Sequence, residues 1–134
     1  MQSRPTTLVA PKSLTIAILE DDKATRDLYQ MLFEHHGGQP RLFRESDACC
    51  AYIRQERPDL LIFDVMGWSA QNGLTVLDTL ADEFGADMPP VIVATALNDR
   101  QIAGHPVLQR LPRWQPLYKP FDIFNLLKTV DNLI

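Results

Sequence analysis

The stretch Leu60-Leu61-Ile62-Phe63-Asp64 limits the fold of this chain more than any other segment. Four consecutive apolar residues end in one carboxylate, and Arg57-Pro58-Asp59 precedes them. A run this short and this apolar is typical of a strand that is buried on both faces of a parallel sheet. Asp64 then stands at the carboxyl end of the strand, which is where open α/β sheets place their ligand sites.

The length and composition of the chain indicate one globular domain. Its 134 residues suffice for one substantial core but not for two, and 46% of them are hydrophobic. The net charge of −4 disfavours nonspecific binding to nucleic acid or to anionic membranes. No apolar run reaches membrane-spanning length and the first residues lack a signal-peptide core, so we expect a cytoplasmic protein.

The cysteines and histidines do not indicate a metal site. Cys49 and Cys50 are adjacent, and a disulfide between them would be strained and would close no loop. We expect both to be small core residues of a helix. His35 and His36 precede a glycine pair at a helix end and His105 is isolated, so we expect ordinary surface side chains at all three.

Strand-like runs alternate with helical patterns five times along the chain. This alternation requires right-handed crossovers and predicts an α/β fold with a doubly wound, five-stranded parallel sheet and helices on both faces. We expect a flexible leader at 1–13 and one domain at 14–134. The expected strands are 14–19, 40–43, 60–64, 91–94 with Thr95-Ala96 directly after it, and the brief 117–118.

Helices are expected between these strands and after the last one. The expected inner residues are Ala24, Leu28, Met31, Leu32 and His35; then Ala48, Cys49, Tyr52 and Ile53 in a helix capped by Ser46; then Leu74, Leu77, Leu80, Ala81 and Phe84; and finally Phe121, Phe124, Leu127, Val130 and Ile134. Residues 66–72 are predicted as a loop. Gly104, Pro106 and Pro112 leave at most a short or irregular fourth helix at 98–114.

Four of the expected strands end in residues that carry metal or phosphate chemistry. Because parallel strands end at the same edge of a sheet, these residues should converge there. Three carboxylates in one place repel one another unless a cation neutralises them, and hard oxygen ligands suit Mg²⁺ or Mn²⁺. One acid is then free to act as a nucleophile while a hydroxyl and an ammonium group hold phosphoryl oxygens, which indicates phosphoryl transfer. The residues are Glu20 and Asp21, Asp64, Thr95, and Lys119.

The same residues lie in motifs that resemble a response-regulator receiver domain, the CheY-like phosphoacceptor module of two-component signalling. The resemblance covers about residues 14–134. The matching segments are Ile18-Leu19-Glu20-Asp21-Asp22 with Arg26 beyond, Arg57-Pro58-Asp59-Leu60-Leu61-Ile62-Phe63-Asp64, Pro90-Val91-Ile92-Val93-Ala94-Thr95-Ala96, and Tyr118-Lys119-Pro120-Phe121.

The resemblance implies a flavodoxin-like strand order of 2-1-3-4-5 and a specific set of roles. Asp64 would accept phosphate from a phosphohistidine of a histidine kinase or phosphotransfer protein. Mg²⁺ would be held by Glu20, Asp21, Asp64 and the backbone carbonyl of Met66. Thr95 and Lys119 would sense the phosphoryl group. Such a domain is not an enzyme in the usual sense, but it catalyses its own phosphorylation and dephosphorylation.

The sequence departs from the family beside the predicted site. Gly67 and Trp68 replace the usual Met-Pro pair, and Gly73 comes nine residues after Asp64 instead of eight. We therefore expect a reshaped loop beside the site, with Trp68 covering the site. Pro116 stands where the family has its aromatic switch residue, three before the lysine. Trp114 or Tyr118 would substitute only with a shifted backbone, so we expect altered coupling from Thr95 to the output surface.

Two apolar residues are expected to border the phosphoryl group. Met66 and Leu97 follow Asp64 and Thr95 by two positions, and neither can position a water molecule. The hypothesis is that the acyl phosphate decays slowly for this family. We also expect segment 98–118, which departs most from the family pattern, to carry partner specificity.

Two other functions use the same fold or the same acid. A pseudo-receiver would use the same fold as a phosphorylation-independent interaction module or as a homodimer, and the altered loop and Pro116 favour it. A phosphatase using Asp64 as a transient nucleophile is disfavoured, because Met66 stands where such enzymes carry a general acid. No helix-turn-helix or basic face indicates DNA binding, and the downstream protein partner stays open.

Overall fold

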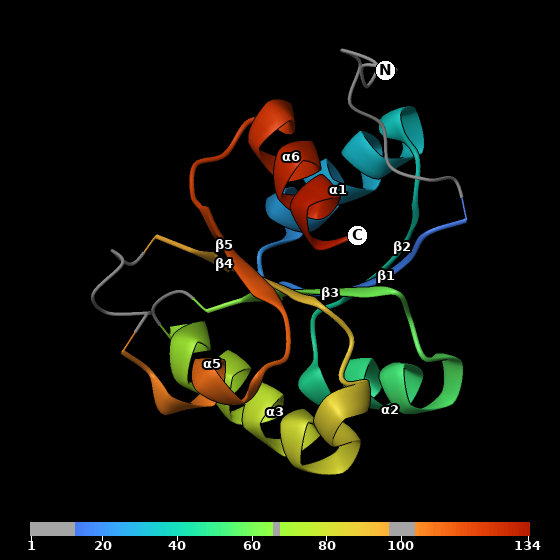
Figure 1. Ribbon diagram of the computed structural model, residues 1–134. Coiled ribbons are helices and arrows are strands. Elements are labelled where there is room, and N and C mark those ends of the chain that lie inside the picture. The colour runs from blue at the N-terminus through green and yellow to red at the C-terminus, as the bar shows by residue number, and fades with distance from the viewer. Residues whose placement is uncertain (1–12, 66–67, 97–103) are drawn as a thin grey trace, which may run out of the picture.

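The computed structural model describes residues 13–65, 68–96 and 104–134, with the backbone alone at 68–72 (Figure 1). The predicted leader, apart from Ser13, and the predicted roles of Met66, Gly67, Leu97 and the Trp68 side chain lie outside the described residues. The elements are β1 (Thr15–Leu19), α1 (Lys23–His36), β2 (Gln39–Phe43), α2 (Ser46–Glu56), β3 (Leu60–Asp64), α3 (Trp68–Phe84), the 3₁₀ turn η1 (Gly85–Asp87), β4 (Val91–Thr95), α5 (Pro106–Arg110), β5 (Trp114–Tyr118) and α6 (Ile123–Leu133).

The five strands form one parallel sheet in the order β2-β1-β3-β4-β5. Helices α1 and α6 cover one face, and α2, α3 and α5 cover the other (Figure 1). This confirms the predicted doubly wound fold and strand order. In the part of the β4–β5 connection that the structure describes, the helix α5 has five residues, in agreement with the predicted short helix. No helix in the described ranges combines the length and the apolarity that a bilayer crossing requires.

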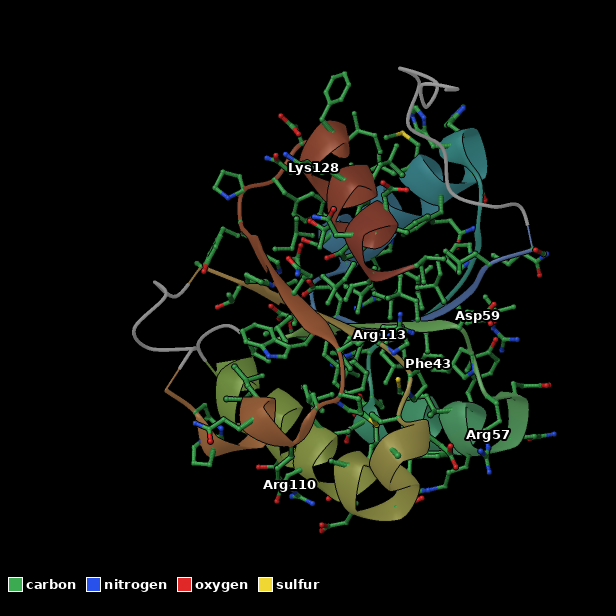
Figure 2. All side chains as sticks on the ribbon, viewed as in Figure 1. Phe43, Arg57, Asp59, Arg110, Arg113 and Lys128 are labelled. Carbon is green, nitrogen blue, oxygen red and sulfur yellow. The ribbon has the colours of Figure 1, made fainter. Side chains whose placement is uncertain are left out.

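The core lies in two layers, one on each side of the sheet. Every residue of β3 and β4 is buried, because both strands are central and helices cover both of their faces. Side chains fill both spaces between sheet and helices (Figure 2). On the outer surface, Arg110 pairs with Asp78 and Asp82 and connects the short α5 to α3.

The buried face of α1 differs from the predicted one. Tyr29 and Phe33 are its buried residues, whereas Leu28 and Met31 are 37% and 47% exposed. Both sets recur at helical spacing, so periodicity alone could not choose between them. The helix turns its two aromatic rings to the sheet because they bury the larger apolar area there.

The buried faces of α6 and α2 also differ from the predicted ones. In α6 the buried side includes Leu126 and Leu133, while Phe124 and Ile134 are 66% and 53% exposed. In α2 Ala48 is exposed, but both cysteines are buried as expected, free and without a disulfide. Burial raises the pKa of the Cys49 thiol to about 12, which fits an unreactive core side chain. The predicted face of α3 is confirmed, with Leu77, Leu80 and Ala81 buried and Leu74 and Phe84 partly buried.

Two helix starts differ from the prediction. Ser46 is the first residue of α2 and Glu45 takes the cap position without a side-chain hydrogen bond, so Ser46 is not the cap. Helix α3 begins at Trp68, so most of the predicted loop at 66–72 is helical.

His105 caps α5, since its Nδ1 accepts a hydrogen bond from the Val107 N–H at 3.2 Å.

Strand β5 has five residues instead of the predicted two, and Pro116 lies in its middle. The strand is an edge of the described sheet, in which its one neighbour is β4. Two backbone hydrogen bonds join the residues at the ends of β5 to β4. The Val91 N–H donates to the Arg113 carbonyl oxygen at 3.1 Å, and the Lys119 N–H donates to the Thr95 carbonyl oxygen at 2.8 Å. By the two-residue alternation of a strand, the nitrogen of Pro116 faces away from β4. The proline therefore removes no hydrogen bond from the ladder.

Candidate functional site

The predicted site residues converge at the carboxyl edge of the sheet. Glu20 follows β1, Asp64 and Thr95 end β3 and β4, and Lys119 follows β5. The Lys119 Nζ donates to Glu20 Oε1 at 2.6 Å and to Asp64 Oδ1 at 3.1 Å. These contacts join residues that are 99 and 55 positions apart in the sequence. The predicted convergence is thus present for the acids and the lysine.

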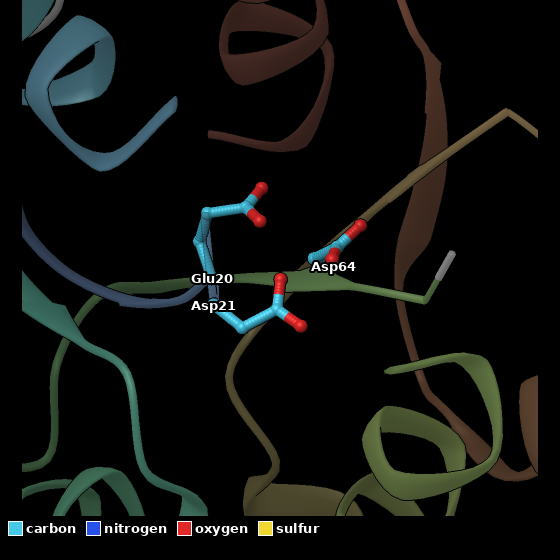
Figure 3. A group of neighbouring side chains, drawn as sticks. All are labelled: Glu20, Asp21 and Asp64. Atoms are coloured by element: carbon cyan, nitrogen blue, oxygen red, sulfur yellow. The ribbon is translucent and has the colours of Figure 1, made fainter. Parts of the chain in front are cut away.

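Three carboxylates form a cluster that fits a hard cation. One oxygen from each of Glu20, Asp21 and Asp64 lies within 4.8 Å of the others. In Figure 3 Glu20 and Asp21 leave the chain in opposite directions and Asp64 lies beside them. Glu20 and Asp64 are 1% and 5% exposed, whereas Asp21 is exposed. Carboxylate oxygens with one side open to water match the ligands that Mg²⁺ and Mn²⁺ prefer.

The start of α1 fixes the backbone that carries two of these acids. Arg26 Nη1 donates to the carbonyl oxygens of Glu20 at 3.0 Å and Asp21 at 2.9 Å. Asp22 caps the helix by accepting from the Thr25 N–H at 2.9 Å, and its own N–H donates to Glu20 Oε2 at 3.2 Å. Sequence reasoning assigned Arg26 no such role, since a side chain that binds backbone carbonyls leaves no periodic signal.

The charges of the cluster are only partly compensated. Burial raises the pKa of the Glu20 carboxyl group; the hydrogen bond from Lys119 opposes this shift and the negative charge of Asp64 adds to it. Burial alone would lower the pKa of Lys119, but the hydrogen bond to Glu20 and the charge of Asp64 outweigh it and raise the pKa. One ammonium group thus serves two buried carboxylates, and a divalent cation would relieve the remaining repulsion.

Gly73 allows α3 to approach the end of β3. A Cβ atom at this position would lie 2.7 Å from the Asp64 carbonyl oxygen and 3.0 Å from Val65 Cγ1. Such separations are too short for an ordinary contact, so the helix can take this place only with glycine. The one-residue displacement of this glycine from the family spacing therefore leaves a close helix-to-strand contact beside Asp64.

Thr95 and Lys119 are connected through the backbone. The Lys119 N–H donates to the carbonyl oxygen of fully buried Thr95 at 2.8 Å. Tyr118 is the residue in register with Thr95 on β5, and it is 40% exposed. Trp114 lies at the other end of the strand, packed against the layer of α2, α3 and α5.

Two hollows border the cluster. A cavity of about 130 Å³ lies on the side of α2 and α3, where its lining includes Asp21, Arg44 and Asp64. A more open groove of about 390 Å³ lies on the side of α1 and α6. Its described lining is mostly apolar and consists of Thr25, Leu28, Ala96, Lys119, Pro120 and Phe121.

Tyr29 carries a buried polar atom in the layer of α1 and α6, and sequence reasoning missed it. Its side chain is 1% exposed, and its hydroxyl is a buried group without a hydrogen-bond partner among the described residues. Its ring stacks on Phe121, with centroids 5.4 Å apart. Burial raises the pKa of the Tyr29 hydroxyl, and the charges of Glu20 and Asp64 raise it further. The signal in the sequence that could have indicated a buried Tyr29 is its spacing of four residues from Phe33, which places two aromatic side chains on one face of the helix.

Comparison with known proteins gives one family. The family model described as the response regulator receiver domain matches residues 16–131. No curated protein sequence matches the chain.

Solved structures share the fold at low sequence identity. A response regulator from Thermotoga maritima is 21% identical with a TM-score of 0.72, and the match covers 94% of this chain and 98% of that one. The N-terminal receiver domain of a two-component response regulator from Bacteroides fragilis is 24% identical with a TM-score of 0.70, covering 89% and 94%. A receiver domain from Bermanella marisrubri is 20% identical with a TM-score of 0.74, covering 90% and 98%.

Proposed function

The chain belongs to the response regulator receiver domain family, and on that premise we propose that it accepts a phosphoryl group on Asp64 from a phosphohistidine of a histidine kinase or phosphotransfer protein. The observation that carries the proposal is the double contact of Lys119 with Glu20 and Asp64 inside a cluster of three carboxylates. A surface acid with a structural role would not need a buried ammonium group and two further acids beside it.

In the proposed transfer, an oxygen of Asp64 attacks phosphorus in line with the departing histidine nitrogen. The P–O bond to Asp64 forms while the P–N bond breaks, and its electron pair returns to the imidazole ring. Lys119 leaves Asp64 to bind a phosphoryl oxygen, and the Thr95 hydroxyl donates to another. The contribution of these groups is positioning and charge neutralisation, which dominate catalysis of phosphoryl transfer.

Glu20, Asp21 and Asp64 would hold Mg²⁺ or Mn²⁺, with the backbone carbonyl of Met66 as a further proposed ligand. The bound ion would neutralise charge on the phosphoryl oxygens. The carboxylates fit this role, because Glu20 and Asp64 are buried while Asp21 is exposed to water. In addition, one lysine compensates the repulsion between the carboxylates only in part. Slow decay of the acyl phosphate, expected from Met66 and Leu97, is part of the same proposal.

Membership of the family implies a kinase partner. We propose that the exchange takes place in the cytoplasm. The groove beside Lys119 supports docking of a protein phosphodonor, because it is mostly apolar and opens next to the acceptor site. Met31 on α1 and Phe124 on α6 are further exposed apolar residues. Both helices lie on the same face of the sheet (Figure 1). Signalling would follow through contact with a downstream protein.

A pseudo-receiver is the second candidate, and Pro116 is the observation that favours it. The proline stands in the middle of β5 where the family has its aromatic switch residue, and α5 has five residues. In this alternative the chain binds a partner or a second copy of itself without phosphate, and the acidic cluster has no acceptor role.

The test is incubation with acetyl phosphate and Mg²⁺ followed by intact-mass measurement, with Asp64→Asn as the control. We expect one added phosphoryl group, about 80 Da, on the natural chain and none on the variant. Calorimetry with beryllofluoride and Mg²⁺ is the second measurement, because fast hydrolysis can hide an adduct. Absence of both the adduct and beryllofluoride binding would refute the phosphoacceptor function and favour the pseudo-receiver.

A further inference from the structure

Arg26 of α1 binds the stretch of backbone that carries two of the three clustered acids. Its Nη1 donates to the carbonyl oxygen of Glu20 at 3.0 Å and to that of Asp21 at 2.9 Å. We propose that Arg26 is a positioning residue that makes the acidic cluster selective for Mg²⁺ over Ca²⁺. The inference rests on the cation site of the proposed function, since it concerns how the protein shapes that site.

The two carbonyl groups lie in the short link between β1 and α1. The register of β1 with both neighbouring strands ends at Leu19, and the Glu20 N–H makes one more hydrogen bond, to the Phe43 carbonyl oxygen at 2.9 Å. The carbonyl oxygens of Glu20 and Asp21 therefore come after the ladder of the sheet and before the first turn of the helix. The arginine supplies hydrogen-bond donors where neither element does.

The position of these carbonyl groups explains how Arg26 acts on the carboxylates. The two peptide planes that contain them meet at the Asp21 Cα atom, so a donor that binds both restrains the φ and ψ angles of Asp21. The side chains of Glu20 and Asp21 leave the chain in opposite directions (Figure 3), yet one oxygen of each lies within 4.8 Å of the other and of an Asp64 oxygen. Their relative position depends on those two angles, which Arg26 therefore holds.

A fixed arrangement of ligands matters more for Mg²⁺ than for Ca²⁺. Mg²⁺ requires near-ideal octahedral coordination at about 2.0–2.1 Å, whereas Ca²⁺ accepts irregular coordination at about 2.3–2.6 Å. If the Asp21 backbone loses its restraint, the carboxylates must be ordered when the ion binds. That cost is larger for the ion with the stricter geometry, so loss of Arg26 should reduce Mg²⁺ affinity more than Ca²⁺ affinity.

The positive charge of Arg26 has the opposite effect and can be separated from positioning. A guanidinium group near the cluster repels a divalent cation, so removal of its charge alone would strengthen the binding of both ions to a similar degree. Weaker Mg²⁺ binding after removal of Arg26 therefore cannot result from the lost charge.

The experiment compares Arg26→Met with the natural chain and with Lys23→Met. Methionine keeps an unbranched stem and has nearly the helix propensity of arginine and lysine. Lys23→Met is the matched control, because it removes the same charge from the first turn of α1, where the 80% exposed Lys23 side chain pairs with Asp27 at 2.8 Å. Calorimetric titrations with Mg²⁺ and with Ca²⁺, without phosphodonor, measure both affinities at a temperature at which urea denaturation shows the proteins to be folded.

We expect Arg26→Met to bind Mg²⁺ about tenfold more weakly, the usual effect of losing an outer partner of metal ligands. Its Ca²⁺ affinity should change by less than about threefold, because irregular coordination tolerates the loosened link. Lys23→Met should keep the natural ratio of the two affinities. An equal loss for both ions in Arg26→Met, an unchanged or tighter Mg²⁺ binding, or the same change of ratio in Lys23→Met would each overturn the inference.

The natural chain separates this inference from the proposed function. If it binds no Mg²⁺, the cation site and the inference both fail. If it binds Mg²⁺ but gains no phosphoryl group and no beryllofluoride, the acceptor function of Asp64 fails while the role of Arg26 is still decided by the ratio of affinities.

A second variant keeps the test decisive if Arg26→Met does not fold. Arg26→Gln has a similar helix propensity and stays polar, but its shorter side chain ends before the place of the guanidinium group. It should show the same loss of Mg²⁺ affinity and the same smaller change for Ca²⁺. Natural selectivity in folded Arg26→Gln would overturn the inference.

Discussion

Lys119 is the residue on which the charge balance of the site depends. It faces two carboxylates that are almost fully buried, and its side chain is 16% exposed. Burial of a carboxylate is unfavourable unless donors surround it, and here one ammonium group serves two acids. The site without a ligand is therefore under electrostatic strain, because the charges of its two buried carboxylates are only partly neutralised.

Glu20→Gln tests this strain. The folded-state pKa of Glu20 is raised, so the folded protein binds the proton more tightly than the unfolded chain, and stability falls as pH rises from the ordinary value of 4.5 through the raised pKa. Without Mg²⁺ we expect the variant to be more stable than the natural chain at pH 7, with the difference vanishing toward pH 4. Urea denaturation across this pH range measures it.

The same variant should lose most of the stabilisation that Mg²⁺ gives to the natural chain, with affinity about tenfold lower or weaker still, since one of three carboxylates is removed. Glu34→Gln, an exposed change on α1, is the control and should leave both properties unchanged. Equal stability of Glu20→Gln and the natural chain at every pH would contradict the assignment of strain to Glu20.

At the residue scale, the site acids and the lysine were predictable and their supporting residues were not. Glu20, Asp64 and Lys119 each stand at the end of an apolar run or just beyond it, so the sheet topology alone brings them together. Arg26 binds the backbone carbonyl oxygens of Glu20 and Asp21, and Tyr29 is buried with its hydroxyl unpartnered among the described residues. Neither depends on a spacing that the sequence displays.

At the scale of elements, the strands were predicted well because buried parallel strands have continuous apolar runs. Helix faces were harder, since α1 carries two apolar stripes and only packing against the sheet selects Tyr29 and Phe33. The extent of β5 was missed because Pro116 usually ends a strand, and an edge position with its nitrogen facing outward removes that objection.

The contact between α3 and β3 is an element-scale feature that one methyl group should disturb. Alanine in place of glycine within a helix normally stabilises by about 1 kcal/mol. At Gly73 the added Cβ would meet the Asp64 carbonyl oxygen at 2.7 Å, so we expect Gly73→Ala to destabilise instead, by about 1–3 kcal/mol. We also expect slower phosphorylation by acetyl phosphate, because Asp64 is displaced.

Urea denaturation and the rate of adduct formation measure these effects. Thr79→Ala, an exposed change on the same helix, is the control and should alter neither by much. A stabilised Gly73→Ala would show that α3 shifts freely, which would refute the close contact as a constraint on Asp64.

At the scale of the whole molecule, the polar edge and the apolar surface beside it lie close together. The groove of about 390 Å³ includes Lys119 in its lining, and Leu28 forms part of its wall on α1. A protein phosphodonor would need such a surface, whereas acetyl phosphate would not. The two donors can therefore be separated by one surface substitution.

Leu28→Asp should slow phosphotransfer from a histidine phosphotransfer protein at least about tenfold, as expected for loss of an apolar anchor at an interface. Phosphorylation by acetyl phosphate should be unchanged. Initial rates with each donor measure the effect, and Ala51→Asp, an exposed change on α2 on the other face of the sheet, is the control. Equal slowing with both donors would place the effect in the site itself and contradict docking at the groove.

Pro116 has a consequence for how copies of this protein meet at high concentration. The outer edge of β5 presents backbone N–H and C=O groups to any extended chain that approaches it. Proteins aggregate by pairing of such edge strands between molecules. A proline at the centre of this five-residue strand leaves a gap in the outward row of donors. Replacement of Pro116 by a residue with an N–H would complete that row, so the departure from the family pattern also protects the protein against fusion of its sheets.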